Sequence, residues 1–242
     1  MHWVVVVAFA FCCSFYDVCA ASPTSTAAPE TITNSVGGTF RLVSPGKLTV
    51  GNGDKTKELV VDEPFYIGVT EVTNAQAMAL MGFVPSEKRE PLSPVESLTW
   101  EEATGFCEVL SAVPRERLAK RIYRLPTSIE WEFACRAGTT TKHFFGDQAI
   151  GRLGVFAWTT DNSGSHTHFV GQKHPNPLGL YDVYGNVWEF CSDLSDDGAA
   201  AVARGGSFKD KQLPHSGRII TFGTSTRMNH VGFRLAMSLP GD

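Results

Sequence analysis

The sequence carries little net charge. Its 21 Lys and Arg residues are nearly balanced by 25 Asp and Glu residues, which gives a formal net charge of −4. A protein that binds nucleic acid gathers Lys and Arg on one surface to neutralise phosphates. The composition therefore argues against a nucleic-acid partner.

Long apolar runs are also scarce. The one strongly apolar stretch, Trp3–Phe15, has about 13 residues, which is too short for a bilayer of roughly 30 Å. It is typical of a signal peptide, and small residues suited to cleavage follow it. We expect residues 1–20 to be a signal peptide cleaved near Ala20 or Ala21, and an exported mature chain, periplasmic or secreted, without a membrane span. The segment before Trp3 has no Lys or Arg, which leaves a protein that is not exported as the alternative.

Cysteine is sparse in the predicted mature chain. Three of the six cysteines lie in the leader, and Cys107, Cys135 and Cys191 remain. An odd number permits one internal disulfide and one free thiol in an oxidising compartment. Three buried cysteines that pack as small hydrophobic residues are the alternative.

The remaining chain divides into a linker and one domain. Residues 21–37 are rich in Ala, Ser, Thr and Pro, which predicts a low-complexity tether. Residues 38–240 form the predicted domain. It opens with short β-like runs between Gly and Pro turns, at Phe40–Val43, Lys47–Val50, Glu58–Val61 and Phe65–Val69.

Three helices are predicted by their first residues. Thr73, Thr99 and Thr127 are each followed three residues later by Gln or Glu, the pattern of a capping box. The expected buried faces include Ala103, Phe106 and Leu110 in the second helix, and Ile129, Phe133 and Ala134 in the third.

Helical patterns end at Gly138. Only brief β-like runs follow, at Val202–Ala203, Arg218–Phe222 and Phe233–Ala236. A long irregular segment inside a compact domain usually carries function or an additional stabilising group. The predicted fold class is α+β, one domain with little regular secondary structure.

Two carboxylates, Asp182 and Glu189, flank a Gly-Asn turn whose carbonyls can point inward. Oxygen donors on a tight turn suit Ca²⁺. An ordinary turn between aromatic residues is the alternative.

The histidines His166, His168 and His174 invite a transition-metal interpretation. No Cys or carboxylate stands beside them at a recognisable ligand spacing, so we expect solvated or packed histidines. The sequence has no Gly-x-Ser-x-Gly, Cys-x-x-Cys or phosphate-binding loop motif. The glycines before Ser207 predict a close approach of two backbone segments.

Six ordered blocks carry a family resemblance. They are Phe65–Asn74, Pro94-Val95 with Trp100, Arg124–Gly138, Gly179–Cys191, Arg204–Phe208 and Gly232–Arg234. Together they resemble the formylglycine-generating enzymes, or sulfatase-modifying factors. The resemblance covers Gly38–Ser238 and implies that family's variant of the C-type lectin fold.

The resemblance implies one structural Ca²⁺ site. Its ligands would be side-chain oxygens of Asp182 and Glu189 and the carbonyls of Gly185 and Val187. A second calcium site of the founding enzyme is expected to be absent, because Ala157 stands where that enzyme has an Asn ligand and the loop around Asn162–His168 is shortened. Cys107 and Cys135 match disulfide-bonded positions of that enzyme, but their partners are not evident here.

The family's oxidase holds copper(I) through two cysteines shortly after the Gly-Gly-Ser block. Residues 207–231 contain no cysteine, and Lys209, Asp210, Lys211 and His215 occupy this stretch. Soft Cu(I) requires thiolates. Copper is therefore not expected, and Trp188 and Ser207, which match residues of the family's oxygen pocket, are expected to be remnants without an assigned catalytic role.

These features predict an exported sulfatase-modifying-factor domain protein without copper. We expect an altered or non-catalytic member that binds a peptide, protein or glycan, because lectin-like scaffolds often serve in recognition. The alternative is an oxidoreductase of the formylglycine-generating or siderophore-maturation type that acts without the cysteine pair.

Overall fold

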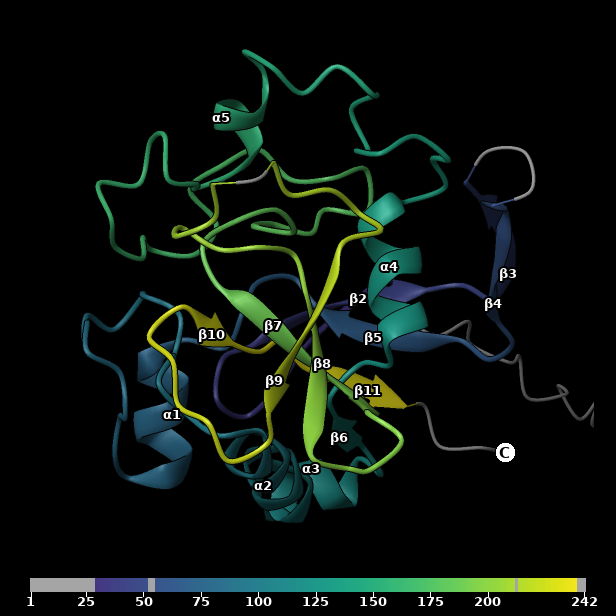
Figure 1. The fold of residues 1–242 in the computed structure, drawn as a ribbon. Helices are drawn as coiled ribbons and strands as arrows, with labels where there is room; N and C mark the ends of the chain where they lie inside the picture. Colours follow the sequence, from purple (N-terminus) through teal and green to yellow (C-terminus); the bar gives the residue numbers. More distant parts are fainter. Residues whose placement is uncertain (1–28, 52–54, 212, 239–242) are drawn as a thin grey trace, which may run out of the picture.

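A computed structural model describes residues 29–51, 55–211 and 213–238, drawn as a ribbon in Figure 1. The predicted signal peptide and the start of the predicted tether lie outside these residues. No helix within the described ranges is long and apolar enough to cross a membrane.

A five-stranded antiparallel sheet crosses the middle of the domain. Its order is β1 (Thr31–Thr33), β2 (Thr39–Val43), β5 (Phe65–Gly68), β11 (Ala236–Ser238) and β6 (Ile122–Arg124). The first strand lies inside the segment predicted to be a tether. Ile32 is partly buried against the core and Asn34 is buried, so this end of the predicted tether belongs to the folded domain.

Alternation along the central strand explains where the core lies. Tyr66 packs in one hydrophobic cluster, whereas its neighbours Phe65 and Ile67 pack in a second cluster. Successive side chains of a strand point to opposite faces, so this sheet separates the two clusters. Every residue of β5 is buried, as expected for a strand covered on both faces.

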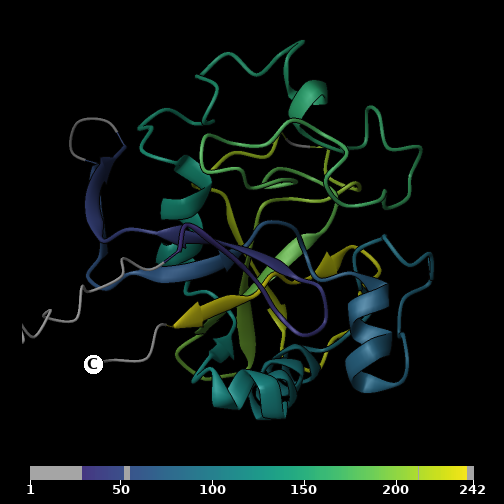
Figure 2. The same ribbon diagram turned by 180° about the vertical axis from the view of Figure 1, so that it is seen from behind.

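A second sheet carries the candidate site. Its order is β10 (Val231–Gly232), β7 (Trp188–Leu194), β8 (Ala200–Arg204) and β9 (Ile219–Gly223), with β10 parallel to β7 and the other pairs antiparallel. The hairpin of β3 (Gly46–Val50) and β4 (Lys57–Val61) stands apart at one side, next to α4, in both Figure 1 and Figure 2.

The three predicted helices are confirmed as α1 (Asn74–Met81), α2 (Trp100–Ala112) and α4 (Ser128–Arg136). Each begins with the predicted capping box, in which the Thr side chain accepts a hydrogen bond from the third helical N–H and the Gln or Glu side chain returns one. A short helix, α3 (Pro114–Leu118), follows α2 directly.

The predicted buried face of α2 is correct, whereas that of α4 is only partly correct. Ala134 is buried and Phe133 packs against the core, as predicted. Ile129 is exposed, however, and Trp131 and Cys135 enter the core. The helix is rotated in this way because Glu132 is buried against cations from neighbouring elements, including Arg204 at 3.0 Å.

The chain after Gly138 has no long helix, as predicted, but the seven-residue strand β7 was missed by the prediction. One helical turn, α5 (Leu153–Phe156), lies in this part of the chain, and turns and bends without a helix or strand run through residues 157–187. The predicted strand at Phe233–Ala236 is wrong in its bounds, because β11 begins only at Ala236. Arg234 interrupts the pattern by directing its guanidinium into the core, where it is fully buried.

The three described cysteines are free and buried. Burial raises the pKa of Cys107 and of Cys135 to about 12, so both stay protonated thiols at neutral pH. The structure therefore confirms the interpretation of Cys107, Cys135 and Cys191 as small hydrophobic residues.

Candidate functional site

The loop before β7 reaches its shape through unusual backbone angles. Asp182 and Asn186 have φ of 56° and 53°, and Gly185 between them has φ of 86°. A Cβ on Gly185 would lie 2.1 Å from the carbonyl oxygen of Trp158, so only glycine fits there. Asn and Asp are the residues that tolerate such angles best.

Glu189 is the centre of a fully buried ion pair. Its two carboxylate oxygens accept hydrogen bonds from the Arg234 guanidinium at 2.5 and 2.6 Å, and one of them also accepts from the Trp131 indole at 2.5 Å. Arg234 donates further to the carbonyls of Gly68 and Tyr181 at 3.0 and 2.9 Å. This arrangement connects β5, α4, β7 and the segment before β11.

Two more buried carboxylates are less well satisfied. Asp182 accepts from the Gly171 N–H at 2.7 Å, and Glu71 accepts from the Asn186 amide at 2.9 Å. The second oxygen of each group, Asp182 Oδ1 and Glu71 Oε2, is buried without a hydrogen-bond partner. Unpaired buried acceptors are costly, so these two atoms call for a proton or a cation.

The pKa shifts of these carboxylates likewise indicate that a proton or a cation is required here. Burial, reinforced by Asp182 and Glu189, raises the pKa of Glu71 well above its ordinary value. Burial also raises the pKa of Asp182 to about 6. Three buried carboxylates face one guanidinium here, and a bound cation would balance the excess negative charge.

The residues predicted to hold calcium fit it in part. Asp182 offers a free oxygen, and the carbonyls of Gly185 and Val187 accept none of the loop hydrogen bonds of the described residues. Glu189, in contrast, already has partners on both oxygens. The described residues contain no cluster of three His, Cys, Asp or Glu side chains able to hold a metal, so a cation here would need backbone oxygens, as Ca²⁺ accepts.

A second polar network follows strand β8, around Ser207. The side chain of Ser207 and its N–H both donate to Asp210 Oδ2, at 2.8 and 2.7 Å. Asp210 Oδ1 accepts from Arg218 at 2.7 Å. The glycines before Ser207 allow the predicted close approach, since a Cβ on Gly206 would lie 2.8 Å from the Pro214 side chain.

Arg218 links this network to Trp188. Its guanidinium carbon lies 4.9 Å from the centroid of the Trp188 ring, at cation–π distance. Trp188 and Ser207 are both buried. The structure therefore brings the two predicted pocket residues together through Arg218, and it does so beneath the surface.

This network does not fit copper(I). Its groups are a hydroxyl, a carboxylate and a guanidinium, and the Asp210 oxygens already accept three hydrogen bonds. Soft Cu(I) selects thiolate and thioether donors, which these groups are not.

An open groove of about 770 Å³ lies beside the network. Lys209 donates to Asn229, and Asn229 donates to Glu87 at 2.6 Å. His230 also lines the groove, and its Nδ1 atom is buried without a partner. Cationic, anionic and amide groups thus stand side by side along this groove.

The histidines after Trp158 pack as expected. The ring of His168 stacks on the indole of Trp158 with centroids 3.7 Å apart, and its Nε2 lies 2.8 Å from the carbonyl of Ser163. His174 lies edge-on to Phe156.

Sequence reasoning assigned no role to Glu71, Arg234 or Asn186. Each stands in a block that carries the resemblance, Glu71 in Phe65–Asn74 and Arg234 in Gly232–Arg234. Charged residues inside short apolar runs were the available signal, because a buried charge needs a partner elsewhere in the fold.

Comparison with known proteins decides the family. The sequence profile of the sulfatase-modifying factor enzyme 1-like domain (FGE-sulfatase) matches residues 25–239. The chain belongs to this family. The match includes the segment around β1, and the mixed helix and sheet architecture of the described residues confirms the expected α+β fold class.

Among curated proteins, a chaperone protein LppX of Paenibacillus barcinonensis is 29% identical over 196 residues, which cover 62% of this chain and 69% of that one. The formylglycine-generating enzyme of Streptomyces coelicolor is 32% identical over 145 residues, which cover 49% of this chain and 43% of the enzyme. This chain thus spans less than half of that enzyme.

Solved structures share the fold over nearly their whole length. Treponema denticola variable protein 1 superposes with a TM-score of 0.76 at 28% identity, covering 86% of this chain and 99% of that one. PvdO from Pseudomonas aeruginosa gives 0.74 at 20% identity, covering 88% and 100%, and supports the fold alone.

Proposed function

We propose that this sulfatase-modifying-factor domain is an exported, copper-independent member that binds a polypeptide in the groove beside Ser207. The observation that carries the proposal is the Asp210 carboxylate. It occupies the segment in which the family's oxidase, by resemblance, has its thiolates, and its oxygens are satisfied by Ser207 and Arg218.

The groove chemistry supports a polypeptide ligand. Lys209 and Arg227 offer donors and Glu87 an acceptor, so the groove can pair with backbone amides and with charged side chains. Trp188 is covered by Arg218 and buried, so it offers no open ring for a sugar to stack on. A glycan is therefore the less favoured ligand.

Calcium belongs to the scaffold in this proposal. Asp182, Glu189 and the carbonyls of Gly185 and Val187 would hold one Ca²⁺, which would balance buried carboxylate charge and fix the loop before β7. The ion would take no part in ligand contact.

Peptide and glycan arrays probed with the purified chain test the proposal. We expect selective binding to peptides, weakened in the variant Lys209→Gln. Lys211→Gln is the matched control, because Lys211 is exposed, lies two residues away and is not part of the groove lining.

Two results would redirect the proposal. Binding to glycans alone would replace the polypeptide as ligand. O₂ consumption by the chain in the presence of an exported metabolite would favour the alternative, an oxidoreductase acting without the cysteine pair.

A further inference from the structure

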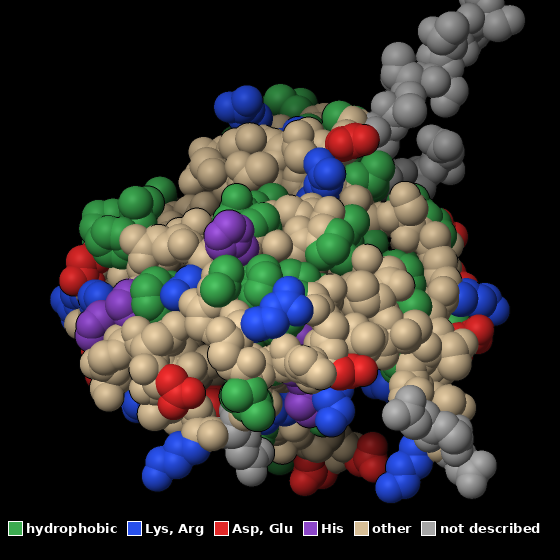
Figure 3. All heavy atoms as spheres, turned by 90° about the horizontal axis from the view of Figure 1, so that it is seen from above, with side chains coloured by type: hydrophobic (Ala, Val, Ile, Leu, Met, Phe, Trp, Pro, Cys, Tyr) green, Lys and Arg blue, Asp and Glu red, His purple; other side chains and the backbone are tan. Residues whose placement is uncertain are grey.

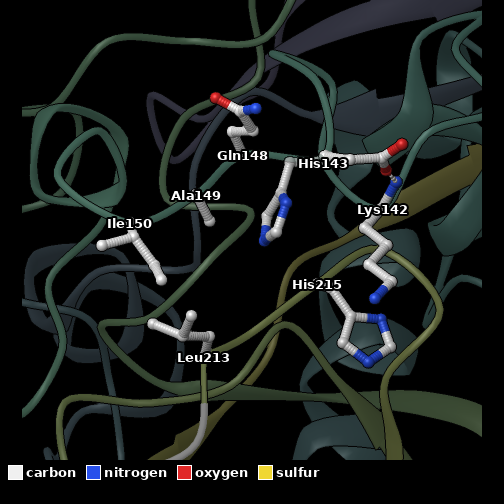
Figure 4. Close-up of a pocket in the computed structure, with 8 residues that line it drawn as sticks. Lys142, His143, Gln148, Ala149, Ile150, Leu213 and His215 are labelled. Carbon is white, nitrogen blue, oxygen red and sulfur yellow. Dashed lines mark hydrogen bonds between the residues drawn. The ribbon is translucent and has the colours of Figure 1, made fainter.

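A separate pocket of about 580 Å³ lies between the loop that follows α4 and the segment before β9. Its lining shares no residue with the groove beside Ser207. Figure 4 shows its two unlike sides: Ile150, Ala149 and Leu213 on one, and Lys142 and His215 on the other.

The floor of the pocket is formed by a buried, well-packed histidine. His143 is buried, with Nε2 2.7 Å from the carbonyl of Pro214 and Nδ1 3.2 Å from that of Gly146. Its ring stacks on Phe145 with centroids 4.9 Å apart. Because both ring nitrogens face carbonyl oxygens, His143 shapes the pocket and is not available to a ligand.

The polar side has unused donors. The backbone N–H of Lys142 donates to Asp147 at 2.8 Å, but its ammonium has no carboxylate partner among the described residues. The ring nitrogens of His215 likewise have no hydrogen bond within the described part of the chain. Asp147 is the one acidic group in the lining.

The local field favours an anion. Burial lowers the pKa of His215, and His143, Arg218, Lys142 and Arg136 lower it further. Each of these neighbours is basic, so a negative charge placed beside His215 is stabilised.

The apolar side is left uncovered. Ile150 is 89% exposed and Leu213 is 45% exposed, although both lie at the pocket. Figure 3 looks onto this end of the molecule and shows hydrophobic side chains and histidines among Lys and Arg side chains. A ligand with a hydrocarbon part would remove this apolar surface from water.

We propose that this pocket binds an aliphatic carboxylate, whose head group pairs with Lys142 and whose hydrocarbon part lies against Ile150 and Leu213. Free short-chain acids and the carboxyl terminus of a peptide with an aliphatic last residue share this chemistry. The proposal does not depend on the polypeptide groove, because the two sites have separate linings.

Calorimetric titration of the purified chain with 4-methylpentanoate tests the site. We expect saturable binding, with the neutral 4-methylpentanamide about tenfold weaker, because a charge-assisted hydrogen bond is lost. Lys142→Gln is expected to weaken the acid about tenfold and to leave the amide unchanged. The matched control is Arg115→Gln on α3, which lies at the opposite end of the molecule from the loop after α4 (Figure 1).

A second variant checks the apolar side. Ile150→Ser removes an exposed hydrocarbon group, so it should weaken acid and amide by the same factor. Equal affinity for acid and amide, an unchanged Lys142→Gln variant, or no saturable binding would overturn the proposal.

Acetylglycylleucine with a free carboxylate distinguishes the two sources. Tighter binding than that of 4-methylpentanoate assigns the pocket to a peptide terminus. Weaker binding assigns it to a free acid.

Discussion

Two neighbouring regions of the second sheet differ in how deeply their charged side chains are buried. Glu189 on β7 pairs in register with Arg204 at the end of β8, and Ser207 follows three residues later. Around Glu189, carboxylates and a guanidinium are fully buried and link four parts of the fold. Around Ser207, Asp210 and Arg218 form an ion pair that is 13–17% exposed and borders an open groove.

This difference indicates that the Glu189 centre stabilises the fold, whereas the Ser207 network borders the proposed ligand groove. The buried centre depends on residues from the blocks that carry the family resemblance, and its loss would leave unpaired charges in the core. The Ser207 network lies in a segment without the family's cysteines, and its ion pair is partly exposed, so we expect a change of residue there to cost little stability.

Arg234→Met is expected to destabilise the chain most. It leaves the Glu189 carboxylate buried without its main partner, which typically costs about 3–5 kcal/mol. Urea unfolding followed by tryptophan fluorescence measures the loss.

Arg227→Met is the matched control for this variant. Arg227 pairs with Glu102 at the surface, where its side chain is 49% exposed, and such pairs contribute about 0–1 kcal/mol. Equal losses in the two variants would contradict the contrast between the buried centre and the surface.

Calcium is expected to stabilise the chain next most. At a calcium concentration a hundredfold above Kd, the gain is about 2.7 kcal/mol, and chelation should reverse it. Asp182→Asn should abolish the response without straining the backbone, since Asn tolerates the φ of 56° at this position.

The control for this response is Asp197→Asn, which removes an exposed carboxylate. Thermal unfolding with and without Ca²⁺ is the measurement. A melting temperature that does not change when Ca²⁺ is added would contradict the proposed calcium site.

Glu116→Gln tests the N-terminal attachment at strand β1. Glu116 is buried and accepts hydrogen bonds from the Ser35 N–H at 2.6 Å, Tyr123 at 2.7 Å and Arg121 at 3.1 Å. Burial alone would raise the pKa of Glu116, but these hydrogen bonds outweigh it and hold the pKa below its ordinary value. The substitution should cost about 1–3 kcal/mol at pH 7.

The pH dependence of that cost has a definite sign. Because the folded pKa is depressed, the stabilisation is complete above the ordinary Glu value of 4.5 and is lost as the pH falls below it through the folded pKa. The difference between wild type and Glu116→Gln should therefore shrink in acid. A constant difference down to the folded pKa, or an equal effect of Glu108→Gln on the exposed face of α2, would contradict this.

Asp210→Asn is expected to have the smallest effect on stability. It weakens the bonds to Ser207 and Arg218 in a partly exposed site, at a cost of about 1 kcal/mol. Asp161→Asn, an exposed substitution, serves as control in the same unfolding assay. A loss of stability as large as that of Arg234→Met would mean that the Ser207 network stabilises the fold as much as the Glu189 centre does, which would contradict the contrast.

Local signals predicted the fold well. The capping boxes at Thr73, Thr99 and Thr127 fixed three helix starts, because cap hydrogen bonds form between residues three apart and need no tertiary contact. The irregular segment of residues 157–187 was also predictable from its composition.

The errors in the predicted fold arose where residues far apart in the sequence contact one another. The buried face of α4 depends on Glu132, whose partners Lys57 and Arg204 come from distant parts of the chain. Strand β1 forms in a polar segment because β2 offers it an edge. Partners so distant in the sequence cannot be predicted from a local pattern.

The candidate site, like the fold, was predictable from its local residues but not in its long-range contacts. The loop with Asp182 and Glu189 was found from its own residues and from the resemblance. That Arg234 holds Glu189, and that Glu71 leaves an oxygen unpaired beside them, required the fold.

Competition titration with a Cu(I) chelator tests whether this chain acts without copper. We expect the purified chain to take no stoichiometric Cu(I) from bicinchoninate and to leave the cysteine of a sulfatase peptide unmodified. One equivalent of tightly bound Cu(I), together with conversion of that cysteine to formylglycine, would contradict this expectation.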